Sequence, residues 1–179
     1  MNPITYRTLD VTEIYPELFE HFERFQEVTH CWRKENGKWL LKEIAFTEQW
    51  DEADYRSLCE KLKKTIERQG VVFSAFSEGN LCGFCSVENE LFGPELQYLA
   101  LSELYVSAPM RRFGIGKQLF TLACDFAKGN GARKLYLSAH SSKESQAFYH
   151  ALGCREAQWY HPALTAAEPC DCQLEKELF

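Results

Sequence analysis

Apolar residues recur at helical spacing in four stretches of the chain, and each stretch predicts a helix with one buried face. The stretches are residues 16–25, 55–66, 119–126 and 141–152. Proline at position 16 suits a first helical turn, because the amide hydrogen that it lacks would be unpaired there. Ser141 and Glu144 form a capping-box pattern that opens the fourth helix. Gly70, Gly129-Asn130-Gly131 and Gly153 follow the three later stretches and are expected to end those helices.

Shorter apolar runs predict strands. They lie at residues 6–9, 71–76, 81–87, 99–106, 134–139, 155–160 and 172–178. Glu78-Gly79-Asn80 separates the second and third runs and indicates a hairpin turn. Residues 28–50 show no regular period, so we expect irregular structure there with a turn at Asn36-Gly37. The alternation of helices and strands, with a strand–helix–strand centre, predicts an α/β or α+β domain.

The composition narrows the class of protein. The 179 residues match the size of one domain and contain no repeat or linker, so we expect a single domain over residues 1–179. A net charge of −6 argues against binding to nucleic acid or to an anionic membrane. No secretory signal is visible, and no apolar stretch approaches the roughly 20 residues of a spanning helix. We therefore expect a cytoplasmic protein whose eight cysteines are reduced thiols.

Two cysteine pairs raise the question of a zinc site. They are Cys82-x-x-Cys85 and Cys170-x-Cys172. Residues three apart on a strand point to opposite faces, and the second pair lacks the spacing of a zinc knuckle. We expect no bound metal.

The segment from Leu104 to Lys117 runs from a strand through a glycine-containing turn into an amphipathic helix. A helix N-terminus presents unpaired amide hydrogens to phosphate, and glycine lets the backbone approach the anion. Arg111 and Arg112 add positive charge, and no Asp or Glu occurs between Leu104 and Cys124. A Walker A loop would need glycine at position 111, and a dinucleotide loop would need glycine at position 119. An Arg-x-x-Gly-x-Gly turn fits, while a basic surface turn before an ordinary helix is the alternative.

The helix that follows the next strand supports the first interpretation. Residues 142–153 have the sequence SKESQAFYHALG. Together with Arg111, Gly114 and Gly116, this segment resembles the GNAT superfamily of acetyl-CoA-dependent N-acetyltransferases over about residues 99–154. Ser142 and Cys154 stand where that family often has Asn and Phe. The resemblance implies a mixed, mostly antiparallel, splayed central sheet of about seven strands flanked by about four helices.

The resemblance also implies acetyl-CoA as the co-substrate. The amides of residues 112–117 would hold the pyrophosphate, and residues 104–106 would line the pantetheine arm. The Val106 N–H would polarise the thioester carbonyl and stabilise the oxyanion that forms there. The implied cofactor-binding residues are Leu104, Tyr105, Val106, Arg111, Arg112, Phe113, Gly114, Ile115, Gly116, Lys117, Ser142, Ser145 and Phe148.

Two residues are candidates for catalysis. Tyr149 matches the proton-donating tyrosine of the family, although an aromatic core position beside Phe148 is the alternative. Glu103 is the candidate general base, because an amine must lose a proton before it attacks. Strand alternation places Glu103 opposite Ser102 and Leu104, so a bulge would be needed to turn it toward the acyl group. A solvated or substrate-binding carboxylate is the alternative for Glu103. Further candidates are His30, Glu48 and His140.

The acceptor implied by the resemblance is the primary amine of a small molecule or peptide. Residues 28–50 are expected to build its pocket, although the three tryptophans there could equally belong to the core. A non-catalytic acyl-CoA-binding module and an acyltransferase with another acyl group or acceptor are the alternatives. The family resemblance also suggests a homodimer.

Overall fold

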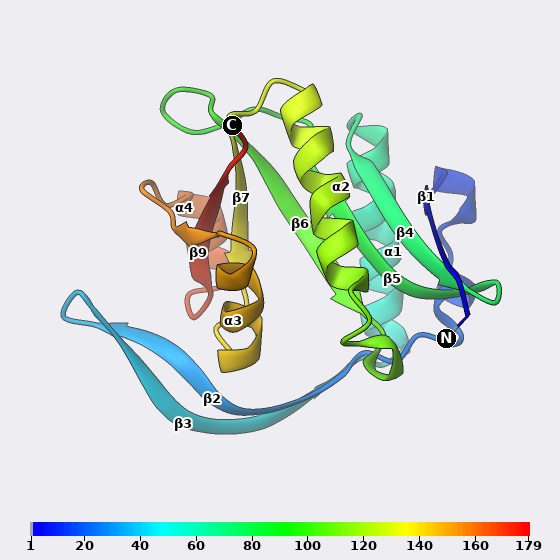
Figure 1. Ribbon diagram of the computed structural model, residues 1–179, viewed down its shortest axis with the longest axis horizontal. Coiled ribbons are helices and arrows are strands. Elements are labelled where there is room, and N and C mark those ends of the chain that lie inside the picture. Colours follow the sequence, from blue (N-terminus) through cyan, green and yellow to red (C-terminus); the bar gives the residue numbers. More distant parts are fainter. Residues whose placement is uncertain (1) are drawn as a thin grey trace.

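In the computed structural model, which describes residues 2–179, seven strands form one mixed sheet (Figure 1). Their order across the sheet is β1 (Ile4–Thr8), β4 (Val71–Ser77), β5 (Asn80–Val87), β6 (Tyr98–Val106), β7 (Lys134–Ala139), β9 (Cys172–Glu177) and β8 (Arg155–Glu156). All neighbours are antiparallel except β6 and β7, which are parallel. The mixed, mostly antiparallel sheet expected from the sequence is thereby confirmed.

The parallel pair at the centre of the sheet is splayed. β6 pairs with β7 only from Tyr98 to Ala100, and the two strands then diverge (Figure 1). On its other side, β6 stays paired with β5 as far as Val106. Residues 101–106 of β6 therefore have one edge that faces no strand in the described part of the chain.

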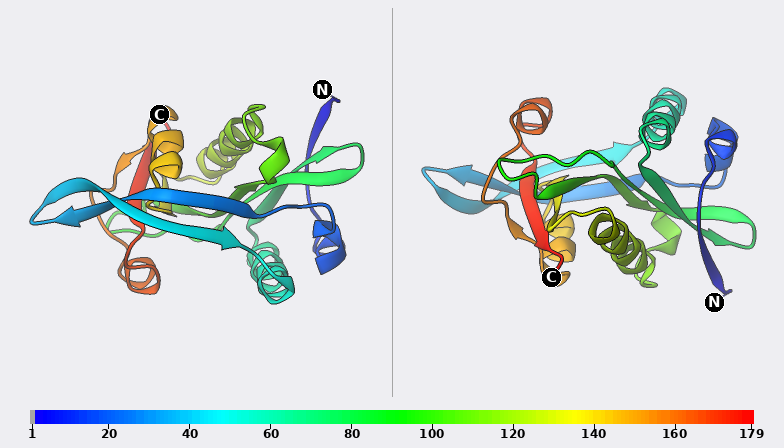
Figure 2. Two further views of the ribbon diagram at one scale, coloured as in Figure 1. Left: turned by 90° about the horizontal axis from the view of Figure 1, so that it is seen from below. Right: turned by 90° about the horizontal axis from the view of Figure 1, so that it is seen from above.

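Helices cover both faces of the sheet. α2 (Ile115–Gly129) and α3 (Lys143–Ala151) lie on one face, and α1 (Glu52–Glu67) and α4 (Pro162–Ala167) lie on the other (Figure 2). Short 3-10 turns occur at Val11–Glu13, Pro16–Phe19 and Ala108–Met110. The burial of apolar side chains between each helix layer and the sheet is the main force that holds these layers together.

Each helix layer has its own core. Leu119, Phe120 and Ala123 of α2 are buried against the sheet in one cluster. Leu58 and Leu62 of α1 belong to a second cluster on the opposite face. Alternation along β6 divides its side chains in the same way, with Leu104 and Val106 packing on the α2 side and Tyr105 on the α1 side.

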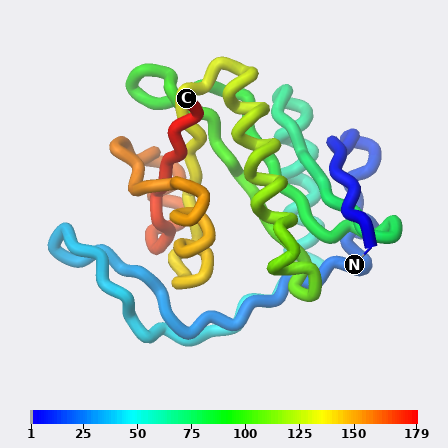
Figure 3. Tube along the Cα trace, viewed as in Figure 1, coloured from blue at the N-terminus to red at the C-terminus, as the bar shows by residue number. Residues whose placement is uncertain are grey.

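A long β-hairpin occupies the region that the sequence predicts to be irregular. β2 (Phe25–Glu35) and β3 (Lys38–Gln49) pair along their length and curve past the splayed end of the sheet (Figure 3). The prediction was wrong because both faces of the hairpin are partly exposed, which leaves no clean period-two pattern. The turn at Asn36-Gly37 is confirmed, with φ values of 50° and 77°. Trp32 N–H donates to Ser141 O at 2.8 Å and ties the hairpin to the start of α3.

Four further expectations about elements were wrong. Residues 16–25 form only the 3-10 turn Pro16–Phe19 before β2 begins, and Phe19 and Phe22 pack against Phe84 of β5 without a helix. The predicted strand over residues 155–160 is two residues long, and α4 follows it after proline at position 162. The cap of α3 is Ser142 rather than Ser141, since the Ser142 hydroxyl accepts from Ser145 N–H. After α1, Gln69 takes the left-handed conformation with φ 69°, so Gly70 is not the capping residue.

Candidate active site

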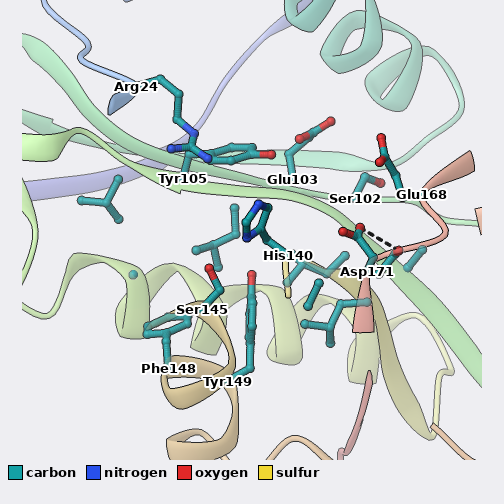
Figure 4. A pocket seen from close by; sticks show the side chains of 18 of the residues that line it. Arg24, Ser102, Glu103, Tyr105, His140, Ser145, Phe148, Tyr149, Glu168 and Asp171 are labelled. Carbon is teal, nitrogen blue, oxygen red and sulfur yellow. Dashed lines mark hydrogen bonds between the residues drawn. The ribbon is translucent and has the colours of Figure 1, made fainter. Parts of the chain in front are cut away.

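A large cleft of about 1580 Å³ opens where β6 and β7 diverge. Side chains from the hairpin, from β6 and from α3 line it. Figure 4 shows those of β6 and α3 facing one another across a common space. Tyr149, Phe148 and Ser145 enter from α3, while Glu103 and Tyr105 lie on the opposite wall (Figure 4).

The turn before α2 is shaped to bind an anion. Arg112 and Gly114 have φ values of 71° and 80°, so two residues of the turn adopt the left-handed conformation. The hydrogen bonds of α2 start with Gln118 N–H, which donates to Gly114 O. The amides just ahead of Gln118 therefore have no carbonyl partner within the helix and are available to a phosphate. Arg112 and Lys117 line the cleft beside these amides.

Arg111 lies at the junction of β6 and this turn. Its Nε donates to Val106 O at 3.2 Å, which holds the end of β6 against the loop. Burial lowers the pKa of Arg111 from its ordinary value. Phe113 is 52% exposed and does not line the cleft, unlike the other residues expected to bind the cofactor in this turn.

Glycine at position 116 lets α2 and α3 approach each other. A Cβ there would lie 3.2 Å from Phe148 Cζ, which is closer than side chains ordinarily pack. The Phe148 ring meets the Tyr149 ring edge-on at 5.1 Å, so this close approach also positions Tyr149. Ile115 is buried in the core cluster between α2 and the sheet, where it anchors the first turn of α2.

Ser142 and Ser145 have different surroundings. Ser142 is fully buried and does not line the cleft, whereas Ser145 does. The Ser142 hydroxyl accepts from Ser145 N–H and from Gln26 Nε2, and it donates to Ser145 Oγ at 2.9 Å. The structure therefore places Ser142 as the cap of α3, with its hydroxyl engaged inside the protein.

Tyr149 projects from α3 into the splay, and its hydroxyl points into the cleft (Figure 4). Burial raises the pKa of Tyr149 well above its ordinary value, and the nearby Glu103 and Asp171 carboxylates add to this shift. The hydroxyl therefore keeps its proton at neutral pH and is available as a donor.

Glu103 lines the cleft, and a β-bulge in β6 immediately precedes it. Ser86 on β5 pairs with Glu103, but the next residue, Val87, pairs with Leu101, so Ser102 is the extra residue on β6. The bulge lies just before Glu103, so Glu103 shares the α1 side of the sheet with Tyr105, and Leu104 lies on the other side. Burial raises the pKa of Glu103 to about 7, with Lys61 partly offsetting it.

Arg24, Glu48 and His140 form a chain of polar contacts that lines the cleft. Arg24 is only 7% exposed, and its Nη2 lies 2.7 Å from Glu48 Oε2. His140 Nε2 lies 3.2 Å from Glu48 Oε1. Ser142 N–H donates to His140 Nδ1, so Nδ1 is an acceptor and the proton of the neutral ring is on Nε2. The hydrogen bond from His140, aided by Arg24, holds the pKa of Glu48 below its usual range.

Arg24 is a site residue that the sequence did not reveal. Its guanidinium lies 5.0 Å from the centre of the Tyr105 ring and 5.5 Å from that of Trp50. These cation–π contacts stabilise the wall that carries Tyr105. A single arginine in the loop before β2 carries no motif, so no pattern could have identified it. His30, by contrast, hydrogen-bonds to Thr29 and does not line the cleft.

Carboxylates gather toward the α4 side of the cleft. Asp171 and Glu168 line it there, and Asp171 Oδ2 accepts from Ser138 Oγ at 3.0 Å. Burial raises the pKa of Asp171, and Glu168 contributes to the shift. This end of the cleft is suited to a cationic ligand, whereas the end near α2 is suited to an anion.

Cys82 and Cys85 are each buried in the core, where their thiols contact Ala75 O and Leu119 O. Residues 2–179 contain no group of three or more His, Cys, Asp or Glu side chains placed to hold a metal ion. Within the same residues, no helix combines the length and apolar character needed to cross a membrane.

A sequence model of the acetyltransferase (GNAT) family matches residues 11–154. The chain belongs to this family. The match includes the hairpin, the splayed strand β6, the anion-binding turn and α3. β8, α4 and β9 lie beyond the matched residues of this GNAT chain and complete its sheet.

Solved structures of GNAT acetyltransferases share the fold. The structure is similar to nourseothricin acetyltransferase, with a TM-score of 0.68, 20% identity, and coverage of 96% of this chain and 95% of that chain. A putative streptothricin acetyltransferase from Bacillus anthracis in complex with acetyl coenzyme A has a TM-score of 0.70 at 12% identity, covering 97% and 95%. PaiA N-acetyltransferase from Thermoplasma acidophilum with coenzyme A has a TM-score of 0.60 at 16% identity, covering 98% and 99%. No curated protein matches the chain in sequence.

Proposed function

We propose that the protein transfers an acetyl group from acetyl-CoA to the primary amine of a small molecule or peptide. The proposal rests on three features that come together where β6 and β7 diverge. The unpaired edge of β6 leads through a short 3-10 turn into the anion-binding turn, and Glu103 and Tyr149 line the same cleft. Donor binding, proton removal and proton donation are thus available in one place.

The residues present fit acetyl-CoA, which supplies an activated acetyl group as a thioester. The amides before Gln118, together with Arg112 and Lys117, would bind its pyrophosphate. Ser107 N–H donates to Cys82 O on β5. Because successive N–H groups of a strand point to opposite edges, Val106 N–H lies on the unpaired edge of β6. That amide is available to polarise the acyl carbonyl.

Glu103 is the proposed general base. An alkylammonium group with a pKa of about 10.4 is neutral only about once in 10³ molecules at pH 7. A carboxylate with a pKa of about 7 is half ionised there and is well matched to accept the proton. Tyr149, which stays protonated, is the proposed donor to the sulfur of the leaving thiolate.

The acceptor is proposed to enter from the face that carries α1 and α4. α2 and α3 occupy the opposite face, where the anion-binding turn lies (Figure 2). The carboxylates of Glu168 and Asp171 on the acceptor side would attract an ammonium group. Among the structural relatives, an aminoglycoside 6'-N-acetyltransferase has a TM-score of 0.55 at 16% identity, which agrees with a cationic acceptor. The cytoplasmic location and the homodimer remain predictions.

Calorimetry with acetyl-CoA, comparing the wild type with Gly114→Trp and Gly79→Trp, tests donor binding. Both glycines have φ of 80° and open space at the Cβ position, but Gly79 lies in the β4–β5 turn. We expect Gly114→Trp to weaken binding at least about tenfold by blocking the turn, and Gly79→Trp to leave it unchanged. Equal effects of both variants, or no binding by the wild type, would contradict the donor site. Binding without acetylation of any amine in a panel would instead indicate a non-catalytic acyl-CoA-binding module.

A further inference from the structure

Arg24 holds hydrogen-bond donors that no protein group uses. A guanidinium group has five N–H donors. Among residues 2–179, the guanidinium of Arg24 makes a single hydrogen bond, from Nη2 to Glu48 Oε2 at 2.7 Å. Glu48 does not form the usual forked pair with it, because Glu48 Oε1 is engaged by His140 Nε2 at 3.2 Å.

The two remaining nitrogens of this guanidinium differ in their surroundings. Nε is enclosed by the protein and has no hydrogen-bond partner in the described part of the chain. Nη1 also lacks a partner there, but it is not enclosed, and Arg24 lines the cleft. Buried polar groups are nearly always hydrogen-bonded, so an unused donor of a buried arginine at a cleft indicates a ligand that accepts from Nη1.

The guanidinium of Arg24 is held in one orientation. Its central carbon lies 5.0 Å from the centre of the Tyr105 ring and 5.5 Å from that of Trp50. Glu48 fixes one edge of the group from the hairpin. A planar guanidinium that cannot turn away is suited to select a carboxylate or carbonyl oxygen.

Charged groups follow a fixed order along β6. Arg24 lies against the Tyr105 ring, and Glu103 is two residues, or about 7 Å, further along the same side of the strand. Glu168 and Asp171 lie beyond Glu103, toward α4 (Figure 4). Within residues 2–179 neither carboxylate forms an ion pair, and Asp171 accepts only from Ser138 Oγ. The proposed base is therefore flanked by an unused guanidinium donor at one end and by unpaired carboxylates at the other.

We propose that Arg24 determines acceptor specificity by binding an oxygen of a carboxyl or carboxamide group, so that the acceptor is a basic amino acid or its amide. This inference depends on the proposed function. Nη1 would hold the carboxylate or carbonyl oxygen beside the reacting amine, from which Glu103 takes the proton. Glu168 and Asp171 would bind the second ammonium group of the same molecule.

Simpler acceptors leave part of this arrangement unpaired. A linear diamine would satisfy the carboxylates of Glu168 and Asp171 but would leave Nη1 of Arg24 without an acceptor. An amino acid without a second amine would satisfy Arg24 and leave the two carboxylates without a cation. A site built to hydrogen-bond one group of a substrate discriminates strongly against the analogue that lacks it.

The experiment compares three acceptors that differ only at the carboxyl group. They are lysine, lysinamide and cadaverine, which is lysine without that group. For the wild type we expect kcat/KM for lysine or lysinamide to exceed that for cadaverine at least about tenfold, mainly through KM. The better of the two lysine compounds shows whether the recognised oxygen belongs to a free carboxylate or to an amide.

Arg24→Gln should bring this ratio close to one without changing the affinity for acetyl-CoA. Arg24→Lys keeps the charge but not the planar fork, so it should retain part of the preference. Arg33→Gln is the control, because Arg33 lies on the same hairpin but donates to Ser141 Oγ and does not line the cleft. Thermal denaturation shows whether each variant is folded, and the wild-type ratio tests the proposal even where a variant is not.

Calorimetry with the CoA-bound protein measures acceptor binding without turnover. We expect lysine or lysinamide to bind at least about ten times more tightly than cadaverine, and this difference should be lost in Arg24→Gln. Equal binding of the three compounds, no binding of any of them, or equal effects of Arg24→Gln and Arg33→Gln would overturn the proposal. If a lysine compound binds as expected but the wild type acetylates no amine, the proposed function fails instead. If amines are acetylated without this preference, the proposed function holds and the specificity assigned to Arg24 fails.

Discussion

At the scale of single residues, burial raises the pKa of both Glu103 and Tyr149, with opposite consequences for their use. Glu103, with a pKa of about 7, exchanges its proton near neutral pH. Tyr149 keeps its proton throughout that range. The residue types were predictable from the sequence, but the shifts were not, because they depend on which groups surround each side chain after folding.

Replacement of Glu103 by Gln should lower kcat/KM for the acceptor by about 10²-fold and remove the acidic limb near pH 7. The pH dependence of the free energy of unfolding should change as well. The usual pKa of this carboxyl is 4.5, so between that value and about 7 the folded state binds more protons than the unfolded state. The wild type should therefore lose free energy of unfolding as the pH rises through this window.

Chemical denaturation at several pH values, together with pH–rate profiles, checks this prediction. Glu67→Gln is the control, because Glu67 is exposed at the end of α1 and does not line the cleft. An acidic limb that persists unchanged in Glu103→Gln would remove Glu103 as the base.

At the scale of elements, α3 is the part that holds the proposed acid in place. It is only nine residues long, so it depends on tertiary contacts for stability. Ser142 caps it and accepts a hydrogen bond from Gln26 at the start of β2. Gln146 Nε2 donates to His140 O, which fixes the helix to the end of β7.

Ser142→Ala should therefore lower the free energy of unfolding by about 1–2 kcal/mol, because both the cap and the bond to Gln26 are lost. Acetyl-CoA affinity should stay within about threefold, or roughly 0.7 kcal/mol, since the side chain does not line the cleft. Thermal denaturation and calorimetry measure both quantities. Thr121→Ala in the exposed part of α2 is the control for hydroxyl removal. A loss of affinity without a loss of stability would show that Ser142 contacts the donor instead.

At the scale of the whole molecule, the sheet separates two chemical environments. The α2–α3 face carries the basic turn, and Glu168 and Asp171 line the cleft toward α4 on the opposite face. Figure 2 shows the two helix layers on either side of the sheet. The splay between β6 and β7 connects the two faces. The net charge of −6 is a sum over the whole chain, and the proposed donor site is basic in spite of it.

Thiol reactivity tests the packing of the whole molecule. Cys170 is exposed and Cys124 is half-buried, while the other six cysteines are buried. Burial raises the pKa of Cys154 and of Cys172 to about 12, so these thiols carry little reactive thiolate. We expect one thiol to react rapidly with an aromatic disulfide reagent in the native protein and all eight to react in urea. Mass spectrometry should identify Cys170 as the fast one, and several fast thiols would contradict the packing described.

The sequence by itself determined the elements whose signals are local. Helical periodicity identified α1 and α2. The hairpin turn at Glu78-Gly79-Asn80 and the strand β7 were also predicted correctly. The family followed from two short motifs at a fixed separation. All of these depend on residues within one or two turns of chain, where spacing alone specifies the local geometry.

Only the tertiary structure decided how the acceptor side of the cleft is built. Arg24, Glu48 and His140 form one chain of contacts although they come from distant parts of the sequence. The bulge at Ser102 depends on the register between β5 and β6, and the unused donors of Arg24 are recognised only after its contacts are known. Such features arise from desolvation and packing between segments that no local pattern relates, so they exist only once the chain has folded.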